Sequence, residues 1–164
     1  MDFIIRPYRQ GEEKYVAEAH RRIYTKEYRW GDSFTEYAIN VALHFAESGH
    51  SERGELWVAE TDGKLVGCIM LCQTDKPLTG QLRLLLVENE YRCLGVGKAL
   101  INTLLARAKN VGYKELILWT ASPLKDAIRH YEKLGFRRVE EIENNKWSLD
   151  GKCLSEIKMQ LTIQ

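Results

Sequence analysis

The sequence predicts an α/β (α+β) domain built around a mixed sheet. Short apolar runs that are typical of strands alternate with longer segments in which apolar residues recur at helical spacing. Asp62-Gly63 joins two of the runs, and an Asp-Gly pair favours a tight hairpin because glycine accepts a positive φ. A third run, Leu82–Val87, passes through a glycine-containing turn into a strongly periodic helix. Hairpins together with strand-to-helix connections indicate a sheet covered by helices.

The length and composition fit one domain, which we expect to span residues 1–164. A chain of 164 residues with 45% hydrophobic content can bury a single core. The formal net charge is +1 and both signs are interspersed, which gives no indication of a nucleic-acid or membrane partner. No run of eighteen apolar residues and no signal-peptide pattern is present, so the cytoplasm is the expected compartment.

Each element follows from a local pattern. The expected strands are residues 3–7, 55–60, 64–72, 82–87, 115–120, 136–142 and 153–163, and the expected helices are 12–24, 33–45, 95–110 and 123–135. Ser33-x-x-Glu36 reads as a capping box at the start of the second helix. At the start of the fourth helix, Ser122 supplies a capping side chain and Pro123 suits the first helical position.

The turn between residues 87 and 98 is the strongest functional signal. The apolar run Leu82–Val87, broken only by Arg83, ends in a polar turn, and Gly95 and Gly97 open the next helix. The first N–H groups of a helix lack partners and attract anions, while glycines let a phosphate approach the backbone. Neither the dinucleotide fingerprint nor the P-loop spacing matches. A diphosphate-binding loop is therefore predicted, and a tight turn without a ligand is the alternative.

Two motifs carry a resemblance to a known superfamily. Arg92-x-x-Gly95-x-Gly97, followed downstream by the motif Tyr-Glu-Lys-Leu-Gly-Phe at residues 131–136, resembles the GCN5-related N-acetyltransferase (GNAT) superfamily. The similarity is good over residues 55–140. The span from residue 81 to residue 147 is also similar to small bacterial acetyltransferase domains found fused to MarR-type regulators. The resemblance implies a mostly antiparallel sheet of about six to seven strands, with splayed central parallel strands and about four helices.

The resemblance also implies a donor substrate and its binding residues. Acetyl-CoA would bind with its pyrophosphate on the backbone N–H groups from Arg92 to Lys98, and coenzyme A would be the product. The pantetheine arm would pair with the strand before the loop, like an added strand. The residues assigned to the cofactor are Leu85, Val87, Arg92, Cys93, Leu94, Gly95, Val96, Gly97, Lys98 and Ser122. The asparagine that is common in the family near this position is Leu124 here, so Ser122 or Lys125 would contact the cofactor on that side.

The implied reaction is direct attack of an amine on the thioester in a ternary complex. Tyr131 occupies the place of the tyrosine that protonates the departing thiolate in the family. The alternative is that Tyr131 is only a core aromatic on the stripe of its helix. Glu156 is a candidate general base in a late strand, and the alternatives are an exposed strand carboxylate and deprotonation of the amine through ordered water.

The acceptor is expected to be a primary amine of a small molecule or peptide. Arg83 interrupts an apolar strand, so its charge should clamp a carboxylate of the acceptor or form an ion pair beneath the N-terminal helices. Tyr28, Trp30 and Trp147 lie in segments that flank the acceptor cleft in related domains, and core or loop packing is the alternative for each. The acceptor's identity and the acyl-chain length do not follow from the sequence.

Other readings are distinguished by specific residues. A non-catalytic acyl-CoA-binding sensor or regulatory module would keep the glycine loop without needing Tyr131. No spacing of histidine and cysteine matches a metal site, and no metal is expected. Cys68 and Cys72 should be reduced thiols on one strand face, whereas Cys93 should be exposed in the loop. The resemblance is also compatible with a homodimer.

Overall fold

The computed structural model describes residues 1–48 and 52–164 and contains a seven-stranded sheet in the order β1-β2-β3-β4-β5-β7-β6. The strands are β1 (Ile4–Pro7), β2 (Glu55–Thr61), β3 (Lys64–Gln73), β4 (Thr79–Val87), β5 (Glu115–Ala121), β6 (Arg137–Asn144) and β7 (Leu154–Thr162). The helices are α1 (Glu13–Tyr28), α2 (Asp32–Ser48), α3 (Val96–Asn110) and α4 (Lys125–Lys133), with a short 3₁₀ turn, η1 (Asn89–Tyr91). This is the predicted mixed architecture.

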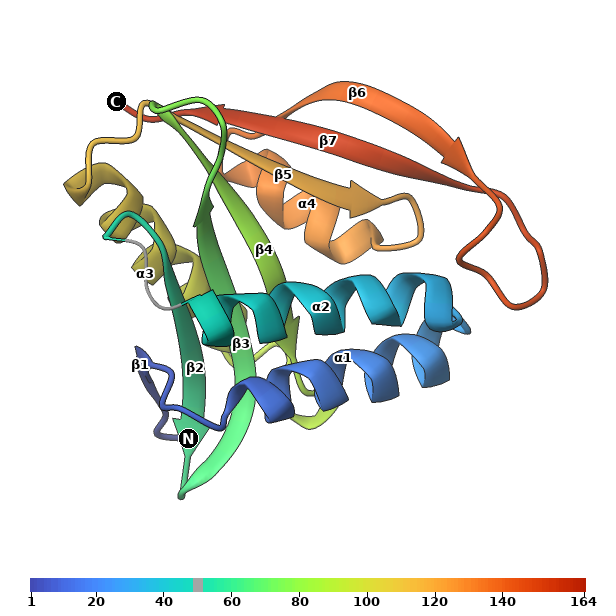
Figure 1. Cartoon of the computed structure of the whole chain (residues 1–164), viewed down its shortest axis with the longest axis horizontal. Coiled ribbons are helices and arrows are strands. Elements are labelled where there is room, and N and C mark those ends of the chain that lie inside the picture. The colour runs from blue at the N-terminus through green and yellow to red at the C-terminus, as the bar shows by residue number, and fades with distance from the viewer. Residues whose placement is uncertain (49–51) are drawn as a thin grey trace.

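The helices cover both faces of the sheet. Helices α1 and α2 lie across one face, and α3 and α4 lie behind the other (Figure 1). Only β4 and β5 run parallel; every other neighbouring pair is antiparallel. One hydrophobic cluster joins the sheet to α3 and α4, and a second joins it to α1 and α2. The sheet is therefore buried on both sides in its centre, which explains the nearly continuous apolar runs.

The predicted hairpin between β2 and β3 is confirmed. Asp62 has φ +48° and Gly63 has φ +74°, which are the two positive values that a type I′ turn requires. The turn sets a register in which Thr61 pairs with Lys64. Cys68 and Cys72 both pack in the cluster beneath α1 and α2, as their spacing on one strand predicts.

Both predicted helix caps are wrong, because each serine makes a tertiary hydrogen bond instead. Helix α2 begins at Asp32, before Ser33, whose hydroxyl donates to the carbonyl of Lys146 at 2.9 Å. Helix α4 begins at Lys125, two residues later than Ser122-Pro123 suggests. The Ser122 hydroxyl accepts the N–H of Ser155 at 2.9 Å and so joins the end of β5 to the start of β7.

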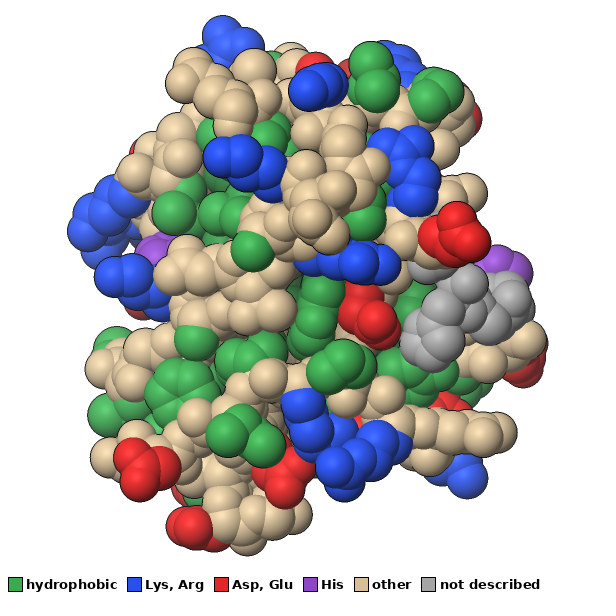
Figure 2. Space-filling view, turned by 90° about the vertical axis from the view of Figure 1, so that its left-hand side faces the viewer, with side chains coloured by type: hydrophobic (Ala, Val, Ile, Leu, Met, Phe, Trp, Pro, Cys, Tyr) green, Lys and Arg blue, Asp and Glu red, His purple; other side chains and the backbone are tan. Residues whose placement is uncertain are grey.

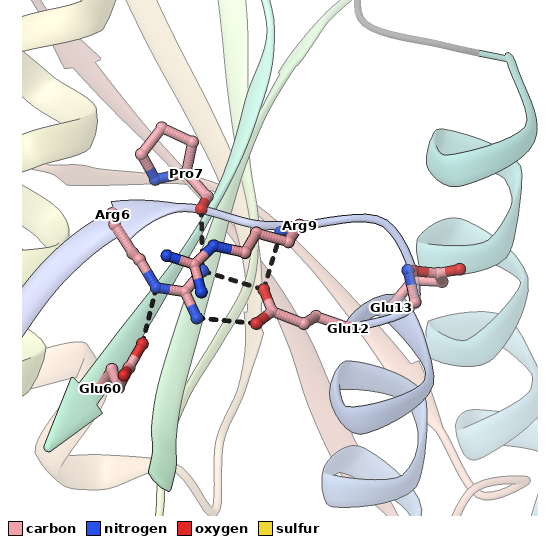
Figure 3. Close-up of polar contacts among 7 residues, drawn as sticks. Arg6, Pro7, Arg9, Glu12, Glu13 and Glu60 are labelled. Carbon is pink, nitrogen blue, oxygen red and sulfur yellow. Dashed lines mark hydrogen bonds and ion pairs between the residues drawn. The ribbon is translucent and has the colours of Figure 1, made fainter. Parts of the chain in front are cut away.

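An ionic network fixes the N-terminal strand against the first helix. Arg6 on β1 donates to Glu60 on β2 at 2.7 Å and to Glu12 at 2.7 Å, and Glu12 also accepts the backbone N–H of Arg9 at 2.7 Å (Figure 3). The guanidinium is shared between two carboxylates, and all three side chains are largely shielded from solvent. Charge-assisted bonds in such surroundings are stronger than those of exposed pairs. The start of α1 is thereby held at the edge of the sheet.

Charges of both signs share the surface. On the face that lies on the left of Figure 1, Lys and Arg side chains lie among Asp, Glu and hydrophobic side chains (Figure 2). Among the described residues, no helix combines the length and the apolar character needed to cross a bilayer.

His20 on α1 makes the stability of this face dependent on pH. The ring is 3% exposed, and its Nδ1 lies 2.7 Å from the carbonyl oxygen of Val16. Burial lowers the pKa of His20 from 6.5 to about 4. The folded state therefore stays neutral at pH values at which the unfolded chain already binds a proton.

We predict that lowering the pH from 6.5 towards 4 destabilises the fold through His20, by on the order of 3 kcal/mol in total. The stabilisation is complete above the unfolded pKa of 6.5 and is lost as the pH falls towards the folded value of about 4. Urea unfolding of the wild type and of His20→Leu at pH 7 and pH 4.5 measures this contribution. An equal loss of stability in both proteins would contradict it.

Candidate active site

The site begins where β4 and β5 part. The two strands pair only from Thr79 opposite Glu115 to Gln81 opposite Ile117. Beyond that point β5 stays paired with β7 as far as Ala121, while β4 continues beside β3 alone. Figure 1 shows the two ribbons diverging from a common end. We call this opening the fork; it leaves the second half of β4 without a strand on its β5 side, as the resemblance implies for the central parallel strands.

A bulge turns the unpaired half of β4 toward the fork. Leu84 has φ +56°, and the register with β3 shifts between Cys68 and Met70. The Leu84 carbonyl accepts a hydrogen bond from the Cys68 thiol at 3.2 Å. In a regular strand, consecutive side chains point to opposite faces of the sheet. The extra residue instead places Arg83 and Leu84 on the same face.

Backbone groups beyond the bulge that do not pair with β3 face the fork, and of these the Val87 carbonyl accepts the Arg92 side chain. Glu88 donates its N–H to the carbonyl of Val66 on β3 at 2.9 Å, and Leu86 stands opposite Cys68. Because backbone groups alternate in direction along a strand, those of Leu85 and Val87 point away from β3, into the fork. These are the two residues predicted to pair with pantetheine, and that role stays a prediction.

The predicted phosphate loop has the geometry of an anion site. Cys93 has φ +63° and Gly95 has φ +90°, which turns the chain sharply into α3. Among the described residues, the N–H groups from Cys93 to Lys98 meet no acceptor. The N–H of Arg92 differs from the prediction, because it donates to the carbonyl of Asn89 at 3.3 Å within the turn. The remaining donors converge at a helix N-terminus, where the helix dipole favours an anion.

The surface above this loop is open. A Cβ on Gly95 would meet nothing within 4 Å, and one on Gly97 would meet only Val87, at 3.6 Å. Leu94 is 51% exposed, and the side chains of Cys93 and Lys98 are also exposed. Val96, by contrast, is buried and fixes the start of α3 in the core. A rigid helix start therefore presents an accessible row of donors.

Two ion pairs hold α1 against the loop. The Arg92 side chain donates to the Val87 carbonyl at 3.0 Å and to Glu27 on α1 at 2.8 Å. Glu88, directly after β4, accepts hydrogen bonds from Arg22 at 2.7 Å and from Tyr15 at 3.1 Å.

The Glu88 pairing also fixes the protonation state of this carboxylate. Burial alone would raise its pKa, but the hydrogen bond and charge of Arg22, the bond from Tyr15 and the charge of Lys64 together outweigh burial, and the pKa of Glu88 lies below its usual value. Glu88 is therefore a structural anchor, and its pairing with Arg22 weakens it as a base.

Tyr131 lies at the fork with its ring buried and its hydroxyl without a partner in the described part of the chain. The residue is 5% exposed, and its ring packs edge-on against Phe136 at a centroid distance of 5.7 Å. Burial raises the pKa of Tyr131, and Tyr24 raises it further. The ring therefore belongs to the core and the hydroxyl keeps its proton at neutral pH, while the catalytic role of Tyr131 stays a prediction.

Tyr24 reaches the same region from the opposite side of the sheet. Tyr24 belongs to α1 and Tyr131 to α4, yet their hydroxyls interact electrostatically. This is possible because no strand separates them in the fork. The sequence does not assign Tyr24 to the site, because no local pattern indicates that two helices on opposite faces meet through an opening.

Glu156 shapes the β6–β7 connection. It stands opposite Ala121 on β5, on the face covered by α1 and α2, and accepts a hydrogen bond from the amide of Asn144 at 3.0 Å. Asn144 in turn accepts the N–H groups of Lys146 and Trp147. One oxygen of Glu156 thus orients a loop, and its proposed role as a base stays a prediction.

The aromatic residues assigned to the acceptor form one cluster. Trp30 is 2% exposed and stacks on Tyr24 at 5.3 Å, so in this structure it is a packing residue. Tyr28 and Trp147 are half-buried and contact Trp30 at 5.3 Å and 5.4 Å. The cluster joins the α1–α2 connection to the β6–β7 loop, where the N–H of Gly31 donates to the Trp147 carbonyl at 2.7 Å. Tyr28 and Trp147 are its accessible members, and their role at the acceptor stays a prediction.

Ser122 is hydrogen-bonded within the sheet, through both its backbone and its side chain. Its N–H donates to the Ser155 carbonyl at 2.8 Å, and its hydroxyl accepts the Ser155 N–H at 2.9 Å. The hydroxyl proton remains free to donate, but the geometry makes Ser122 primarily a link between β5 and β7. Its assignment to the cofactor stays a prediction.

Arg83 lines a cavity of about 550 Å³ beneath α2. The cavity's other walls come from α2 and from β3, and they include Tyr37 and Asn40. No acidic side chain pairs with Arg83 among the described residues. The alternative of an ion pair beneath the helices is therefore not found there. Trp119 on β5 is 38% exposed and was not assigned to the site, because in the sequence it is one more apolar residue of a strand.

The cysteines lie as the sequence predicts. Cys68 is buried, Cys93 and Cys153 are exposed, and all four cysteines are free thiols. Burial raises the pKa of Cys72 to about 11 and raises that of Cys68 as well, so neither is a nucleophile. No cluster of potential metal ligands occurs among the described residues.

Known proteins of similar sequence are acetyltransferases. Human N-acetyltransferase 8B is 35% identical over 125 residues, which cover 70% of this chain and 55% of that protein. Human N-acetyltransferase 8 is 39% identical over 94 residues, 54% of this chain and 41% of that protein. The chain spans about half the length of these relatives.

Solved structures share the fold over the whole chain. An acetyltransferase of the GNAT family from Staphylococcus aureus Mu50 superposes with a TM-score of 0.78 at 20% identity, covering 99% of this chain and 100% of that one. The yncA protein of Salmonella typhimurium, solved with its cofactor acetyl-CoA, superposes with a TM-score of 0.77 at 18% identity. The match covers 100% of this chain and 95% of that one. The model of the acetyltransferase (GNAT) family matches residues 15–136. With the fork and the donor-lined loop inside that span, the chain belongs to the GNAT acetyltransferase family.

Proposed function

We propose that this protein is an acetyl-CoA-dependent N-acetyltransferase that transfers the acetyl group to a primary amine of a small molecule or peptide. Direct attack in a ternary complex releases coenzyme A. The observation that carries the proposal is the fork, because it lies between a row of free N–H donors and the hydroxyl of Tyr131. Family membership and the relatives' activity support the same chemistry.

The chain fits a diphosphate-bearing thioester at two places. The donors from Cys93 to Lys98 suit the pyrophosphate, and the open edge at Leu85 and Val87 suits the amide groups of pantetheine. Acetyl-CoA supplies an activated acyl group. The protein binds it along β4, orients it in the fork, and offers backbone N–H groups that can stabilise negative charge on the carbonyl oxygen.

Tyr131 is suited to hold a proton for the leaving thiolate. Its raised pKa keeps the hydroxyl protonated, and that hydroxyl is not engaged by any described residue. A donor of this kind is useful because the thiolate is the most basic group formed when the thioester breaks. Glu156 is the only carboxylate that we assign as a candidate base, acting through water in the cleft.

A non-catalytic acyl-CoA sensor is the second candidate. It is favoured only by the features it shares with an enzyme, namely the loop and the fork. The unengaged hydroxyl of buried Tyr131 weighs against it, since a sensor gains nothing from such a group. Turnover with any amine separates the two.

Further aspects of the proposal rest on the sequence. We assign the protein to the cytoplasm, with no nucleic-acid partner, and a homodimer is compatible with the fold. The similarity to acetyltransferase domains fused to MarR-type regulators stays an expectation. The amine acceptor is the least determined part of the function and is taken up below.

We predict that Gly97→Glu weakens acetyl-CoA binding at least tenfold, because bulk and negative charge enter the pyrophosphate site. The fold should survive, since the new Cβ meets only Val87 and a carboxylate is favourable in the first turn of a helix. Calorimetric titration measures the affinity. Asn102→Glu, an identical charge change at an exposed position of α3, is the control. Unchanged affinity in Gly97→Glu would remove the loop from the site.

We predict that Tyr131→Phe lowers kcat by on the order of 10²-fold or more and leaves acetyl-CoA affinity nearly unchanged. The phenyl ring keeps the packing against Phe136 and loses only the proton donor. Thiol release under saturating substrates measures kcat. Tyr113→Phe, which removes a hydroxyl that donates to the Arg53 carbonyl, is the matched control and should keep its kcat. Wild-type turnover in Tyr131→Phe would exclude the assigned role.

A further inference from the structure

Arg83 is a half-buried cation, and no acidic side chain among the described residues forms an ion pair with it. It stands opposite Met70 in the β3–β4 register, on the face covered by α1 and α2. Its Nε is buried without a hydrogen-bond partner. Its guanidinium carbon lies 5.8 Å from the centroid of the Tyr37 ring, and this cation–π contact brings no counter-charge. Such a group is costly unless an anion binds it.

The cavity beside Arg83 is suited to receive that anion. Its described lining contains no aspartate or glutamate. Tyr37 and Asn40 add polar groups, while Val41, Phe45 and Met70 supply apolar walls. Arg83 also acts on the Cys72 thiol, but burial raises the pKa of that thiol to about 11, so it carries no negative charge at neutral pH. The volume of about 550 Å³ suits a small molecule.

The cavity lies at the closed end of the fork. Arg83 comes two residues after Gln81, the last residue of β4 that pairs with β5, and two residues before Leu85. Two residues of a strand span about 6.6 Å. The exposed Trp119 lies on β5 two residues after Ile117, the last residue of β5 that pairs with β4. A small molecule held by Arg83 is thus within reach of the edge of β4 on which the thioester would lie.

We propose that Arg83 binds the carboxylate of the acceptor, and that the acceptor is therefore a small amine that carries a carboxylate and an apolar body, such as an amino acid. Arginine is the residue that best matches a carboxylate, through two parallel hydrogen bonds. The apolar walls of the cavity contact the remainder of the molecule. The proposal rests on the proposed acetyltransferase function and specifies its acceptor.

Matched acceptor pairs test this inference. L-Phenylalanine is compared with L-phenylalaninamide, and L-methionine with L-methioninamide, because each amide keeps the amine and the side chain but lacks the negative charge. Thiol release at saturating acetyl-CoA gives kcat and KM for each acceptor. Arg83→Gln removes the charge, and Arg83→Lys retains the charge without the planar guanidinium group. Arg137→Gln, at an exposed position of β6, is the control for loss of an arginine.

The wild type should prefer the carboxylates, and Arg83→Gln should raise their KM on the order of 10- to 100-fold, as expected for loss of a charge-assisted bond. Arg83→Lys should recover part of the loss, and the amides should respond to neither variant. Equal use of acid and amide by the wild type would overturn the inference, as would an unchanged KM in Arg83→Gln. Failure of all four amines to react, and to bind in calorimetric titrations with coenzyme A present, would also overturn it.

Acetyl-CoA titration separates this inference from the function on which it rests. Arg83→Gln should bind acetyl-CoA like the wild type, because Arg83 lies outside the phosphate loop. If the wild type does not bind acetyl-CoA, the acetyltransferase proposal itself fails. If it binds acetyl-CoA and does not discriminate within the pairs, only the assignment of the acceptor fails.

Discussion

The site depends on one constraint: beyond Gln81, β4 has a partner strand on one side only. β5 stays hydrogen-bonded to β7 along its whole length, whereas β4 stays beside β3 through the bulge at Leu84, so the two strands part. A buried sheet edge must satisfy its backbone groups. The half of β4 that ends at Val87 is therefore predisposed to accept an extended ligand in place of a strand. The donors at the start of α3 continue the same line.

The elements around the fork keep it open and in register. Arg92 joins the loop to Glu27, and Glu88 joins the end of β4 to Arg22, so α1 is held against the phosphate loop. At the other end, the cluster of Trp30 and its neighbours joins the α1–α2 connection to the β6–β7 loop. The fork is thus bounded by tertiary contacts on both sides. This explains why hydroxyls from α1 and α4 interact through it.

Local patterns allowed the loop, the hairpin at Asp62-Gly63 and most elements to be predicted from sequence. Predictions failed where a side chain's partner is distant in sequence. Serine is a suitable helix-capping residue, but the hydroxyls of Ser33 and Ser122 each form a hydrogen bond with a backbone group that is distant in sequence. The polar residues before Leu82 concealed the start of β4, which is fixed by pairing with β5. The alternatives at Arg83 could be separated only once its neighbours were known.

Backbone amide exchange measured by NMR, with and without coenzyme A, tests the central claim most directly. If the ligand occupies the fork and the loop, the amides of Leu85 and Val87 and those from Cys93 to Lys98 should become protected, because each lacks a described acceptor in the free protein. The amide of Leu86, which faces β3, should change little. Tight binding of coenzyme A that leaves the amides of β4 and the loop unprotected would contradict the account.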